Sequence, residues 1–468
     1  MDLLKKSAIV LILGLSSAFA GIEQAPPSFS SSGKRAVWVD FIKAKYDLTF
    51  DINNKKASAV STIEFELAEK GYPIFDLDIG PRSVSIDGVR YSQSEIKTPD
   101  RESKVRIIKK ELLPGSYTLK IENNIVNGIK FRRKDVSAAF FMSDLKDRNF
   151  LEKYIPSNYE YDQYKIELSL KVLGARKSHR LFTNGSLVQK SDNYYKYSYP
   201  EYFTSSSLFF HFVPENKFKV ISYTYESKLS NGSHFPVTLY SKTNRFNKKM
   251  KKEVDSVLRE LERDYGPWPH PQLILYGDGE WKGGMEYAGA ATSAFYSIGH
   301  ELQHSYFARS VMPANGNAGW IDEAVASWRD NYLKSAKNNS KSNDLIPVGR
   351  SRNRRSGANL ANHSPYRRVT PKMSYTNGSD FIFYLDSLFS RVPGKSVKKF
   401  LKIYYQNRKY TTISNNDFKL DLENYYGETL DLSFNKYIFG NSSKDKSIIS
   451  EDDHYHPVLS KQELLDLI

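Results

Sequence analysis

Two histidines and a glutamate in the middle of the chain have the spacing of metal ligands. His300, Glu301 and His304 form the pattern H-E-x-x-H. On a helix, His300 and His304 lie one turn apart and project from the same face, so both imidazoles can reach one metal ion. Glu323 follows in the segment W-I-D-E-A-V-A, which is predicted to be a second helix. Two His and one Glu, with a fourth position left open, are typical of a catalytic zinc ion.

The alternative is a chance pattern on a helix of ordinary surface histidines. The chain has nine His in 468 residues, so a random H-E-x-x-H is expected in on the order of one in a hundred such chains. A Glu at a suitable distance on its own helical pattern makes coincidence rarer still. We therefore predict one Zn²⁺ ion, held by His300, His304 and Glu323, with Glu301 beside it as the general base.

Together these motifs resemble the zinc aminopeptidases of the membrane alanyl aminopeptidase family, which are gluzincins with a thermolysin-like catalytic domain. The resemblance rests on G-G-M-E-Y at residues 283–287, on the H-E-x-x-H helix and on Glu323 in a W-x-x-E-A setting. It implies that Glu286 binds the free α-amine of the substrate, although Tyr287 stands where the family usually has Asn. It also implies a strand along the substrate that comprises Gly283, Gly284, Met285 and Glu286.

The same resemblance implies a catalytic Tyr in a Y-x-x-G motif that leads into an apolar helix. Tyr375 matches this motif, because Y-T-N-G precedes the apolar run at residues 381–389. The hydroxyl of Tyr375 would donate a hydrogen bond to the tetrahedral oxyanion. Tyr384 is the reserve candidate, but its place inside the apolar run favours a role in the core.

Residues 36–215 have the pattern of a β domain. Apolar and polar residues alternate in three segments, at residues 46–52, 62–67 and 164–172. Asp87-Gly88 and Asn184-Gly185 are turn signals between such segments. Half-buried antiparallel strands with short turns predict a saddle or a sandwich of sheets.

In the resembled family, such an N-terminal domain caps the catalytic cleft and contributes a polar anchor to the first specificity pocket. No motif in this sequence matches that anchor. Asp144 and Glu152 lie in roughly the right region, and we interpret them as solvated surface carboxylates.

Residues 216–440 change to a mixed pattern. The predicted elements are strands at 218–239 and 272–276, and helices at 246–265, 397–407 and 417–426. A small sheet that precedes two zinc-binding helices is what a thermolysin-like α+β domain requires. The predicted fold class is therefore multidomain α+β, with an N-terminal antiparallel β saddle or sandwich domain followed by a thermolysin-like zinc-peptidase domain. Larger family members add a C-terminal helical-repeat domain, and this chain is expected to be a short form without it.

The first residues have the parts of a secretory signal peptide. Lys5 and Lys6 precede an apolar run at residues 7–15, and A-F-A precedes Gly21. We expect residues 1–20 to be removed, which leaves an exported protein, periplasmic or extracellular, without a transmembrane segment. An uncleaved anchor is the alternative. After the signal peptide, residues 21–35 are expected to form a flexible lead. At the C-terminus, residues 441–468 are expected to form a polar tail.

Composition and charge limit the possible partners. A chain with 40% hydrophobic and 26% charged residues is typical of a globular protein, and its length predicts two or three domains. The net charge of +15 favours an anionic envelope surface or acidic substrates, or serves solubility alone. No nucleic-acid-binding motif is present, so no nucleic acid partner is expected. The absence of Cys excludes disulfides and a Cys-linked lipid anchor.

Six arginines crowd a polar segment at residues 350–368. One hypothesis is that this segment lines the product side and attracts substrate carboxylates, which Arg binds in a bidentate manner. The alternative is a solvated basic loop. The six are Arg350, Arg352, Arg354, Arg355, Arg367 and Arg368.

These features together predict a secreted zinc metallopeptidase, and specifically an aminopeptidase that acts on peptides with a free N-terminus. One alternative is an endopeptidase or a related hydrolase of the same fold, including an enzyme that resembles the epoxide hydrolases among the relatives. Another is a non-catalytic protein that docks on an anionic cell-envelope polymer. The complete set of ligands, with Glu301 and Glu286, argues against the last alternative.

Overall fold

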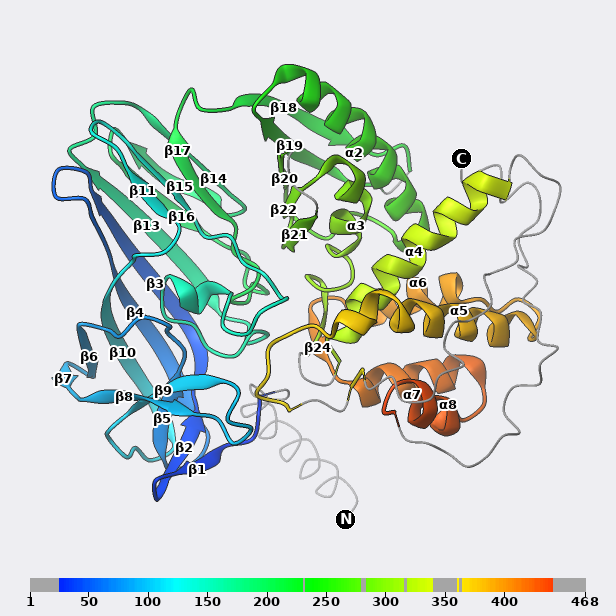
Figure 1. Cartoon of the computed structure of the whole chain (residues 1–468), viewed down its shortest axis with the longest axis horizontal. Helices are drawn as coiled ribbons and strands as arrows, with labels where there is room; N and C mark the ends of the chain where they lie inside the picture. Colours follow the sequence, from blue (N-terminus) through cyan, green and yellow to red (C-terminus); the bar gives the residue numbers. More distant parts are fainter. Residues whose placement is uncertain are drawn as a thin grey trace, which may run out of the picture. The chain divides into compact units, whose positions relative to one another are not determined.

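The structure is a computed structural model that divides into two compact units (Figure 1). The predicted signal peptide, the polar tail and most of the Arg-rich segment lie outside the described residues. The structure describes residues 25–229, 232–278, 283–314, 318–339 (side chains to 333), 360–361 and 364–440. The first unit takes its described residues from Met1–Ile129, Leu151–Ala175 and Ser186–Ser205, and the second from Lys130–Phe150, Arg176–Gly185 and Ser206–Ile468.

An eight-stranded sheet in the first unit is built on two long strands, β3 (Asp40–Asp51) and β4 (Lys56–Leu67). Its order is β15-β16-β13-β3-β4-β10-β6-β7. Only β13 and β3 pair in parallel among its strands. The other strands are β13 (Lys165–Leu173), β15 (Ser186–Ser191), β16 (Tyr194–Ser198), β10 (Gly115–Asn124), β6 (Ser83–Ile86) and β7 (Val89–Arg90).

Alternating burial along these strands confirms the predicted period of two. Tyr46, Leu48 and Phe50 are buried on β3, and the residues between them are partly exposed. The turn predicted at Asp87-Gly88 joins β6 to β7, and both residues have positive φ (48° and 81°). Such a turn suits a two-residue hairpin because its twist matches that of the strands.

The second sheet of this unit begins earlier than the sequence predicted. β1 (Phe29–Ser31) and β2 (Lys34–Trp38) form a hairpin that begins inside residues 21–35, the segment expected to be a flexible lead. The hairpin turns at Ser32 and Gly33, which both have positive φ (48° and 74°). The serine-rich composition of this segment suggested flexibility. Composition alone does not show that two polar segments pair as strands. The sheet continues through β5 (Tyr72–Phe75), β9 (Lys104–Ile108) and β8 (Gln93–Lys97).

A four-stranded sheet in the order β11-β12-β17-β14 belongs largely to the second unit. Asn184 does not make the hairpin turn that its sequence signal indicated, because β14 pairs in this sheet and β15 pairs in the eight-stranded one. Its buried side chain instead donates to the carbonyls of Ser207 and Ala288, at 2.7 Å each. The strands are β11 (Ile129–Phe131), β12 (Val136–Ala139), β17 (Phe210–Pro214) and β14 (His179–Thr183).

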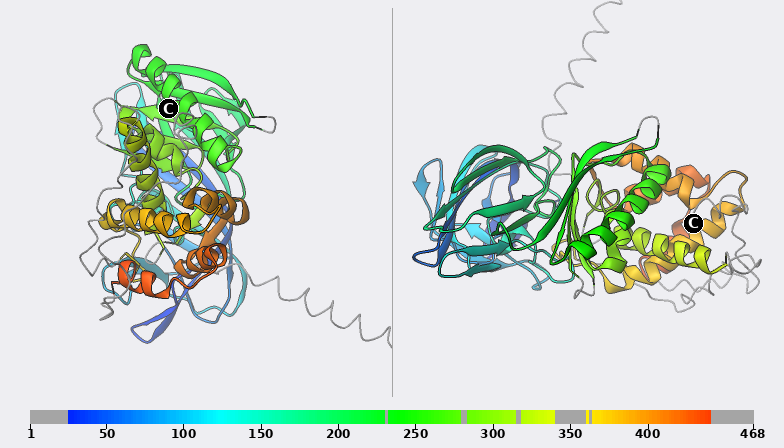
Figure 2. Two further views of the ribbon diagram at one scale, coloured as in Figure 1. Left: turned by 90° about the vertical axis from the view of Figure 1, so that its right-hand side faces the viewer. Right: turned by 90° about the horizontal axis from the view of Figure 1, so that it is seen from above.

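The site is built on a five-stranded sheet in the order β18-β19-β20-β22-β21. Helix α2 (Asn244–Tyr265) packs its apolar side against this sheet and ends at Gly266, as predicted (Figure 2). β21 pairs only with β22 among the described strands, in antiparallel orientation. The strands are β18 (Lys219–Glu226), β19 (His234–Ser241), β20 (Leu273–Gly277), β21 (Gly284–Tyr287) and β22 (Ala290–Ser293).

Helices fill the rest of the second unit around one hydrophobic core. The strand pair β23 (Val311–Pro313) and β24 (Thr411–Ile413) connects two parts of this helical region. The sequence predicted most of these helices but not α8. They are α3 (Ile298–Gln303), α4 (Trp320–Asn339), α5 (Asn377–Ser390), α6 (Val397–Arg408), α7 (Asn415–Tyr426) and α8 (Asp431–Tyr437), with the short 3-10 turns η2 (Phe295–Ser297) and η4 (Lys372–Tyr375). A further 3-10 turn, η1 (Leu151–Lys153), belongs to the first unit.

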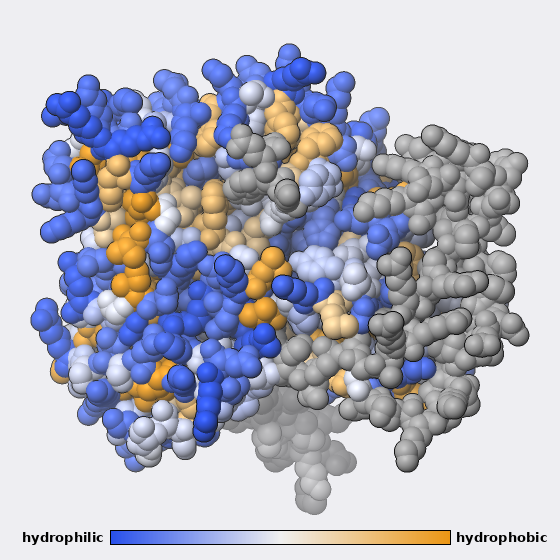
Figure 3. Space-filling view, viewed as in Figure 1, coloured by the Kyte–Doolittle hydropathy of each residue, from blue (hydrophilic) through white to orange (hydrophobic). Residues whose placement is uncertain are grey.

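Hydrophilic residues predominate on the face shown in Figure 3, and hydrophobic ones occur in scattered patches. Within the part of the chain that the structure describes, no helix is both long and apolar enough to cross a bilayer.

Two buried histidines lead to a prediction of how the stability of the folded protein depends on pH. Burial lowers the pKa of His211 and of His270 to about 3. Both rings stay neutral in the folded protein, whereas in the unfolded chain they take up a proton below the usual histidine pKa near 6.5. Their contribution to the stability of the folded state is therefore fully present above pH 6.5. That contribution falls as the pH drops towards 3, by up to about 1.4 kcal/mol per pH unit for each group.

We expect His211→Gln to flatten the decrease in Tm between pH 7 and pH 4.5, because one proton uptake on unfolding is removed. Thermal unfolding followed by circular dichroism measures this slope. His234→Gln is the control, since His234 is exposed and its loss should leave the slope unchanged. Equal slopes in all three proteins would contradict the prediction.

Candidate active site

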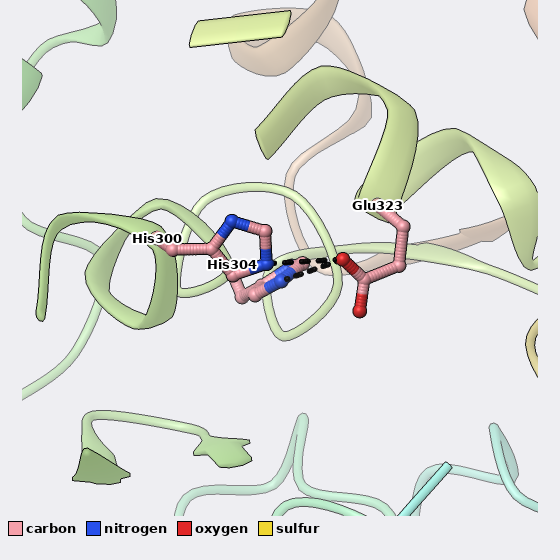
Figure 4. A group of neighbouring side chains, drawn as sticks. All are labelled: His300, His304 and Glu323. Atoms are coloured by element: carbon pink, nitrogen blue, oxygen red, sulfur yellow. Dashed lines mark hydrogen bonds and ion pairs between the residues drawn. The ribbon is translucent and has the colours of Figure 1, made fainter. Parts of the chain in front are cut away.

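The two histidines of the H-E-x-x-H motif are positioned by the short helix α3, which carries His300 and ends just before His304. His304 caps its C-terminal end, while Ile298 and Leu302 on the opposite side are buried in the core. The apolar residues therefore fix the helix so that both imidazoles face the same way. Figure 4 shows the two rings turned towards the carboxylate of Glu323, which comes from the first turn of α4.

Three donor atoms converge at this point. Nε2 of His300 lies 3.0 Å from Oε2 of Glu323, and Nε2 of His304 lies 3.5 Å from the same oxygen. Nδ1 of His304 contacts the carbonyl oxygen of Phe307 at 3.2 Å, which directs Nε2 inwards. This buried Nε2 has no hydrogen-bond partner among the described residues. A nitrogen left in this state, beside a second imidazole and a carboxylate, fits a ligand of Zn²⁺.

The electrostatics of the three residues favour a cation. Burial lowers the pKa of His304, but Glu323 and Glu286 outweigh it and raise the pKa to about 10. Burial raises the pKa of Glu323, but the two histidines hold it below its usual range. Positive charge among these groups is therefore stabilised, and a zinc ion supplies it without protonating the imidazoles.

A further carboxylate, which the sequence reasoning missed, orients His300. Oδ2 of Asp330 lies 3.0 Å from Nδ1 of His300. Arg329 contacts Oδ1 of Asp330 at 3.1 Å and also forms a bidentate pair with Glu260 on α2, at 2.8 and 2.6 Å. A Cβ atom on Gly299 would lie 2.7 Å from the Arg329 guanidinium, so this glycine admits the arginine beside α3. Asp330 thereby fixes the ring orientation of His300.

Glu301 is buried beside the three donors and lies directly against β21. Burial raises its pKa to about 8. A Cβ atom on Gly284 would overlap the Glu301 carboxylate and the carbonyl oxygen of Thr292. The second glycine of G-G-M-E-Y is thus required for close approach of the strand to Glu301, whereas a Cβ on Gly283 would meet nothing.

Glu286 is buried on β21, and the structure gives it a partner that the sequence did not indicate. Nη2 of Arg309 donates to Oε1 of Glu286 at 2.8 Å, and both side chains are less than one-tenth exposed. Arg309 follows the H-E-x-x-H helix in a turn held by the bond from its own N–H to the carbonyl of His304, at 2.9 Å. Met285, the neighbouring strand residue, is buried.

Two carboxylates extend the acidic surroundings of the donors. Burial raises the pKa of Asp144 to about 7, and Glu323 and Glu286 add to the effect. Burial and the neighbouring Glu323 also raise the pKa of Asp322. Carboxylates that share one buried region disfavour each other's ionisation until a cation arrives.

The interpretation of Asp144 and Glu152 as solvated surface carboxylates is therefore wrong. Glu152 is fully buried, and its Oε2 accepts from the hydroxyl of Ser157 at 3.4 Å. Asp144 is half-buried and influences Glu286 and Glu323, both distant in sequence. The loop around Asp144 has no regular pattern, so its direction could not be read from the sequence.

Tyr375 reaches the same donors. Its hydroxyl donates to Oε1 of Glu323 at 2.6 Å, and its ring stacks on that of His300 at 6.1 Å between centroids. The reason for the Y-x-x-G pattern is visible in the packing, because a Cβ on Gly378 would lie 2.8 Å from Cβ of Ala324. The glycine lets α5 approach α4 and bring Tyr375 to Glu323.

Tyr384 is a core-packing residue, in agreement with its place in an apolar run. Its hydroxyl contacts that of Ser433 at 3.0 Å, and its ring packs against Phe381 and Tyr437.

Of the Arg-rich segment, Arg367 and Arg368 belong to the described residues, and the other four arginines do not. The backbone N–H of Arg368 donates to Oδ1 of Asp147 at 3.2 Å, and its guanidinium lies 4.0 Å from the same oxygen. Thr370 donates its N–H to the carbonyl of Asp144 at 3.0 Å. The described end of the segment thus holds the loop that carries Asp144.

Comparison with known proteins gives a match at the level of structure. No family model matches the sequence, and no curated protein matches it significantly. The M1 zinc metallopeptidase from Deinococcus radiodurans, however, matches with a TM-score of 0.60 at 15% identity, over 91% of this chain and 98% of that one. The chain has the fold of the M1 zinc metallopeptidases. The predicted resemblance and the multidomain α+β fold class are thereby confirmed.

Other structures with the M1 fold match to a similar degree. A mutant of the Deinococcus enzyme bound to a Tyr-Ser-Ala substrate has a TM-score of 0.59 at 15% identity, over 87% of this chain and 95% of that one. Yeast LTA4 hydrolase in complex with Bestatin has a TM-score of 0.63 at 12% identity, over 93% of this chain and 72% of that one.

The close approach of β21 to Glu301 leads to a prediction for Gly284→Ala. The added methyl group should displace the Glu301 carboxylate, so we expect hydrolytic activity to fall by about tenfold or more while zinc content is retained. Gly80→Ala is the control, because a Cβ there meets no atom within 4 Å. Full activity of the Gly284→Ala protein would show that Glu301 does not need its observed position.

The contact between Asp330 and His300 leads to a prediction for metal affinity. Asp330→Ala should weaken zinc binding by about 10- to 100-fold, because the ring of His300 loses its orienting partner. Competition with a chromophoric chelator measures the Kd. Asp421→Ala serves for comparison, since Asp421 pairs with Arg408 and should leave zinc affinity unchanged.

Proposed function

We propose that this protein is a zinc-dependent metallopeptidase, and specifically an aminopeptidase that releases N-terminal residues from peptides. The observation that carries the proposal is that two groups of side chains lie close together. Zinc donors and a general base lie at one point, and a buried carboxylate on a sheet edge, Glu286, lies within 4.8 Å of the donor His304. The first group is suited to hydrolysis, and the second to a cationic substrate end.

The charged surroundings of Glu286 support a substrate with a free amine. Arg309 is paired with Glu286, and the carboxyl groups of Asp144, Asp322 and Glu323 lie in the same buried region and influence one another. An ammonium group stabilises the ionised form of such carboxyl groups, whereas a substrate carboxylate would add to their repulsion.

The side chains have separate tasks in the reaction. A zinc ion held by His300, His304 and Glu323 supplies Lewis-acid activation of water and of the scissile carbonyl. Glu301 accepts the proton of the attacking water and passes it to the leaving amine. Burial suits this task, since it raises the pKa of the Glu301 carboxyl towards neutrality.

Tyr375 and the edge strand β21 position the substrate. The hydroxyl of Tyr375 lies next to Glu323, where it can donate a hydrogen bond to the tetrahedral oxyanion. β21 has one side unpaired among the described strands, and an extended peptide can add to such an edge through its backbone. Glu286 then holds the α-ammonium group, with Asp144 as a further carboxylate near it.

The place of action follows from the sequence. We propose export to the periplasm or the extracellular space, because residues 1–20 have the pattern of a cleavable signal peptide. The excess of basic residues is compatible with an anionic envelope surface as a second partner.

The test is hydrolysis of a panel of fluorogenic aminoacyl amides by the purified mature protein, with and without a chelator and added zinc. We expect chelator-sensitive release from free-amine substrates and little from their N-acetylated counterparts. Glu301→Gln should reduce turnover by about a hundredfold or more with zinc retained. Glu286→Ala should chiefly damage the free-amine substrates.

Other results would favour the alternatives. Equal cleavage of N-acetylated and free peptides would indicate an endopeptidase or a related hydrolase, and an epoxide substrate belongs in the panel because LTA4 hydrolase shares the fold. Bound zinc without turnover on any substrate would indicate a binding protein.

A further inference from the structure

Three basic segments of the second unit meet at one end of the sheet β11-β12-β17-β14. They run from β11 into β12, into the start of β14 and out of the end of β17. His179 at the start of β14 pairs with Pro214 at the end of β17, and β12 also runs antiparallel to β17, so its start lies at that end too. We call this region the basic sheet end. Its basic residues are Lys130, Arg132, Arg133, Lys134, Arg176, Lys177 and Lys217. All seven are exposed.

Direct contacts hold the first two of these segments together. The backbone N–H of Arg176 donates to the carbonyl oxygen of Lys134 at 3.3 Å. Nζ of Lys177 lies 3.0 Å from Oδ2 of Asp135, in the turn that leads into β12. The basic side chains therefore belong to one surface, although they come from parts of the chain that are distant in sequence.

Lys217 brings the third segment to the same place. Its Nζ donates to Oγ of Ser137 on β12 at 3.4 Å. Partial desolvation lowers the pKa of Lys217, and the charges of Arg132 and Lys130 add to the effect, while Asp135 opposes it. Crowded like charges repel one another and destabilise the folded state. An anion from outside the protein would relieve this repulsion.

Few acidic groups neutralise the basic sheet end. Its segments contain two acidic residues, Asp135 and Glu215. Asp135 is buried, and its partner Lys177 is the only one of the seven basic residues with an acidic group within 4.0 Å among the described residues. Most of the positive charge is therefore available to a partner.

The surroundings favour a partner that stays in water. No large apolar side chain is exposed among the described residues of these segments, whereas surfaces that insert into a bilayer present Trp, Phe or Leu. Arg and Lys both bind phosphate, and Arg does so with two parallel hydrogen bonds. A phosphate group has several acceptor oxygens, so it can accept from more than one of the crowded cations. A polymer of such groups can contact all three segments at once.

We propose that the basic sheet end is a docking surface for a hydrated anionic polymer of the cell envelope that carries repeated phosphate groups. The choice of an envelope polymer rests on the export proposed above, and the surface itself does not depend on the peptidase reaction. Docking keeps an exported enzyme at the envelope, where it would otherwise diffuse away.

The test is binding of the zinc-loaded mature protein to immobilised long-chain inorganic polyphosphate, which carries neither bases nor lipid tails. Biolayer interferometry at several salt concentrations gives the Kd. The triple variant Lys130→Gln, Arg132→Gln, Lys217→Gln should raise the Kd by about tenfold or more at low salt. The dependence of log Kd on log salt concentration should become shallower by about two to three, because each lost phosphate contact removes about 0.7 to 0.9 from the slope.

A matched control removes the same charges elsewhere in the second unit. Arg245, Lys248 and Lys252 are exposed on α2, and their replacement by Gln should leave the Kd within about twofold of the wild-type value. The double variant Arg133→Gln, Arg176→Gln provides a second route if the first variant does not fold. We expect it to raise the Kd by about threefold or more.

Several outcomes would overturn this inference. They are no binding of polyphosphate by the wild-type protein, and equal weakening by the sheet-end variant and the α2 control, which would show an effect of net charge alone. Tighter binding to polyglutamate than to polyphosphate would overturn the assignment of phosphate. Tighter binding to phosphatidylglycerol vesicles than to polyphosphate would indicate a bilayer and would overturn the polymer.

Hydrolysis of aminoacyl amides, measured in parallel, distinguishes this inference from the proposed function. We expect the sheet-end variant to lose docking and to keep the wild-type rate of hydrolysis, since none of its changed residues belongs to the candidate active site. A wild-type protein that binds polyphosphate but hydrolyses no substrate would overturn the proposed function and support the docking surface.

Discussion

The arrangement of the site depends on concentrated negative charge that is buried around two imidazoles. Glu323 receives contacts from His300, His304 and Tyr375, which come from α3 and from the turn before α5. Each contact is favourable because the carboxylate is ionised and shielded from water. The apolar core beneath α3 and α4 holds these groups together against the repulsion between the neighbouring carboxylates.

Much of this arrangement follows from local patterns. The spacing in H-E-x-x-H placed two ligands on one face because a helix repeats every 3.6 residues. The alternation along β3 and the stop of α2 at Gly266 were equally local. The motif around Tyr375 was recognised by resemblance, and its physical reason became visible only in the contact between Gly378 and Ala324.

What the sequence did not predict involves contacts between distant segments. Arg309 pairs with Glu286 because a turn after α3 aims it back at the sheet edge, and no periodicity describes that turn. Asp144 was misread because its loop is irregular. Asp330 could have been found, since it lies two helical turns after Glu323 on α4 and therefore on the same face. A search for acidic residues at that spacing was the missing step.

The brevity of α3 has a consequence for the fate of the chain in the cell. The helix runs only from Ile298 to Gln303, and a helix this short is not stable by itself. It persists through its packing and through the charges that meet at its end. A ligand that binds only the folded state raises its stability, so metal supply should influence how often this segment opens to proteases. Scarcity of zinc would then lower the abundance of the protein as well as its chemical competence.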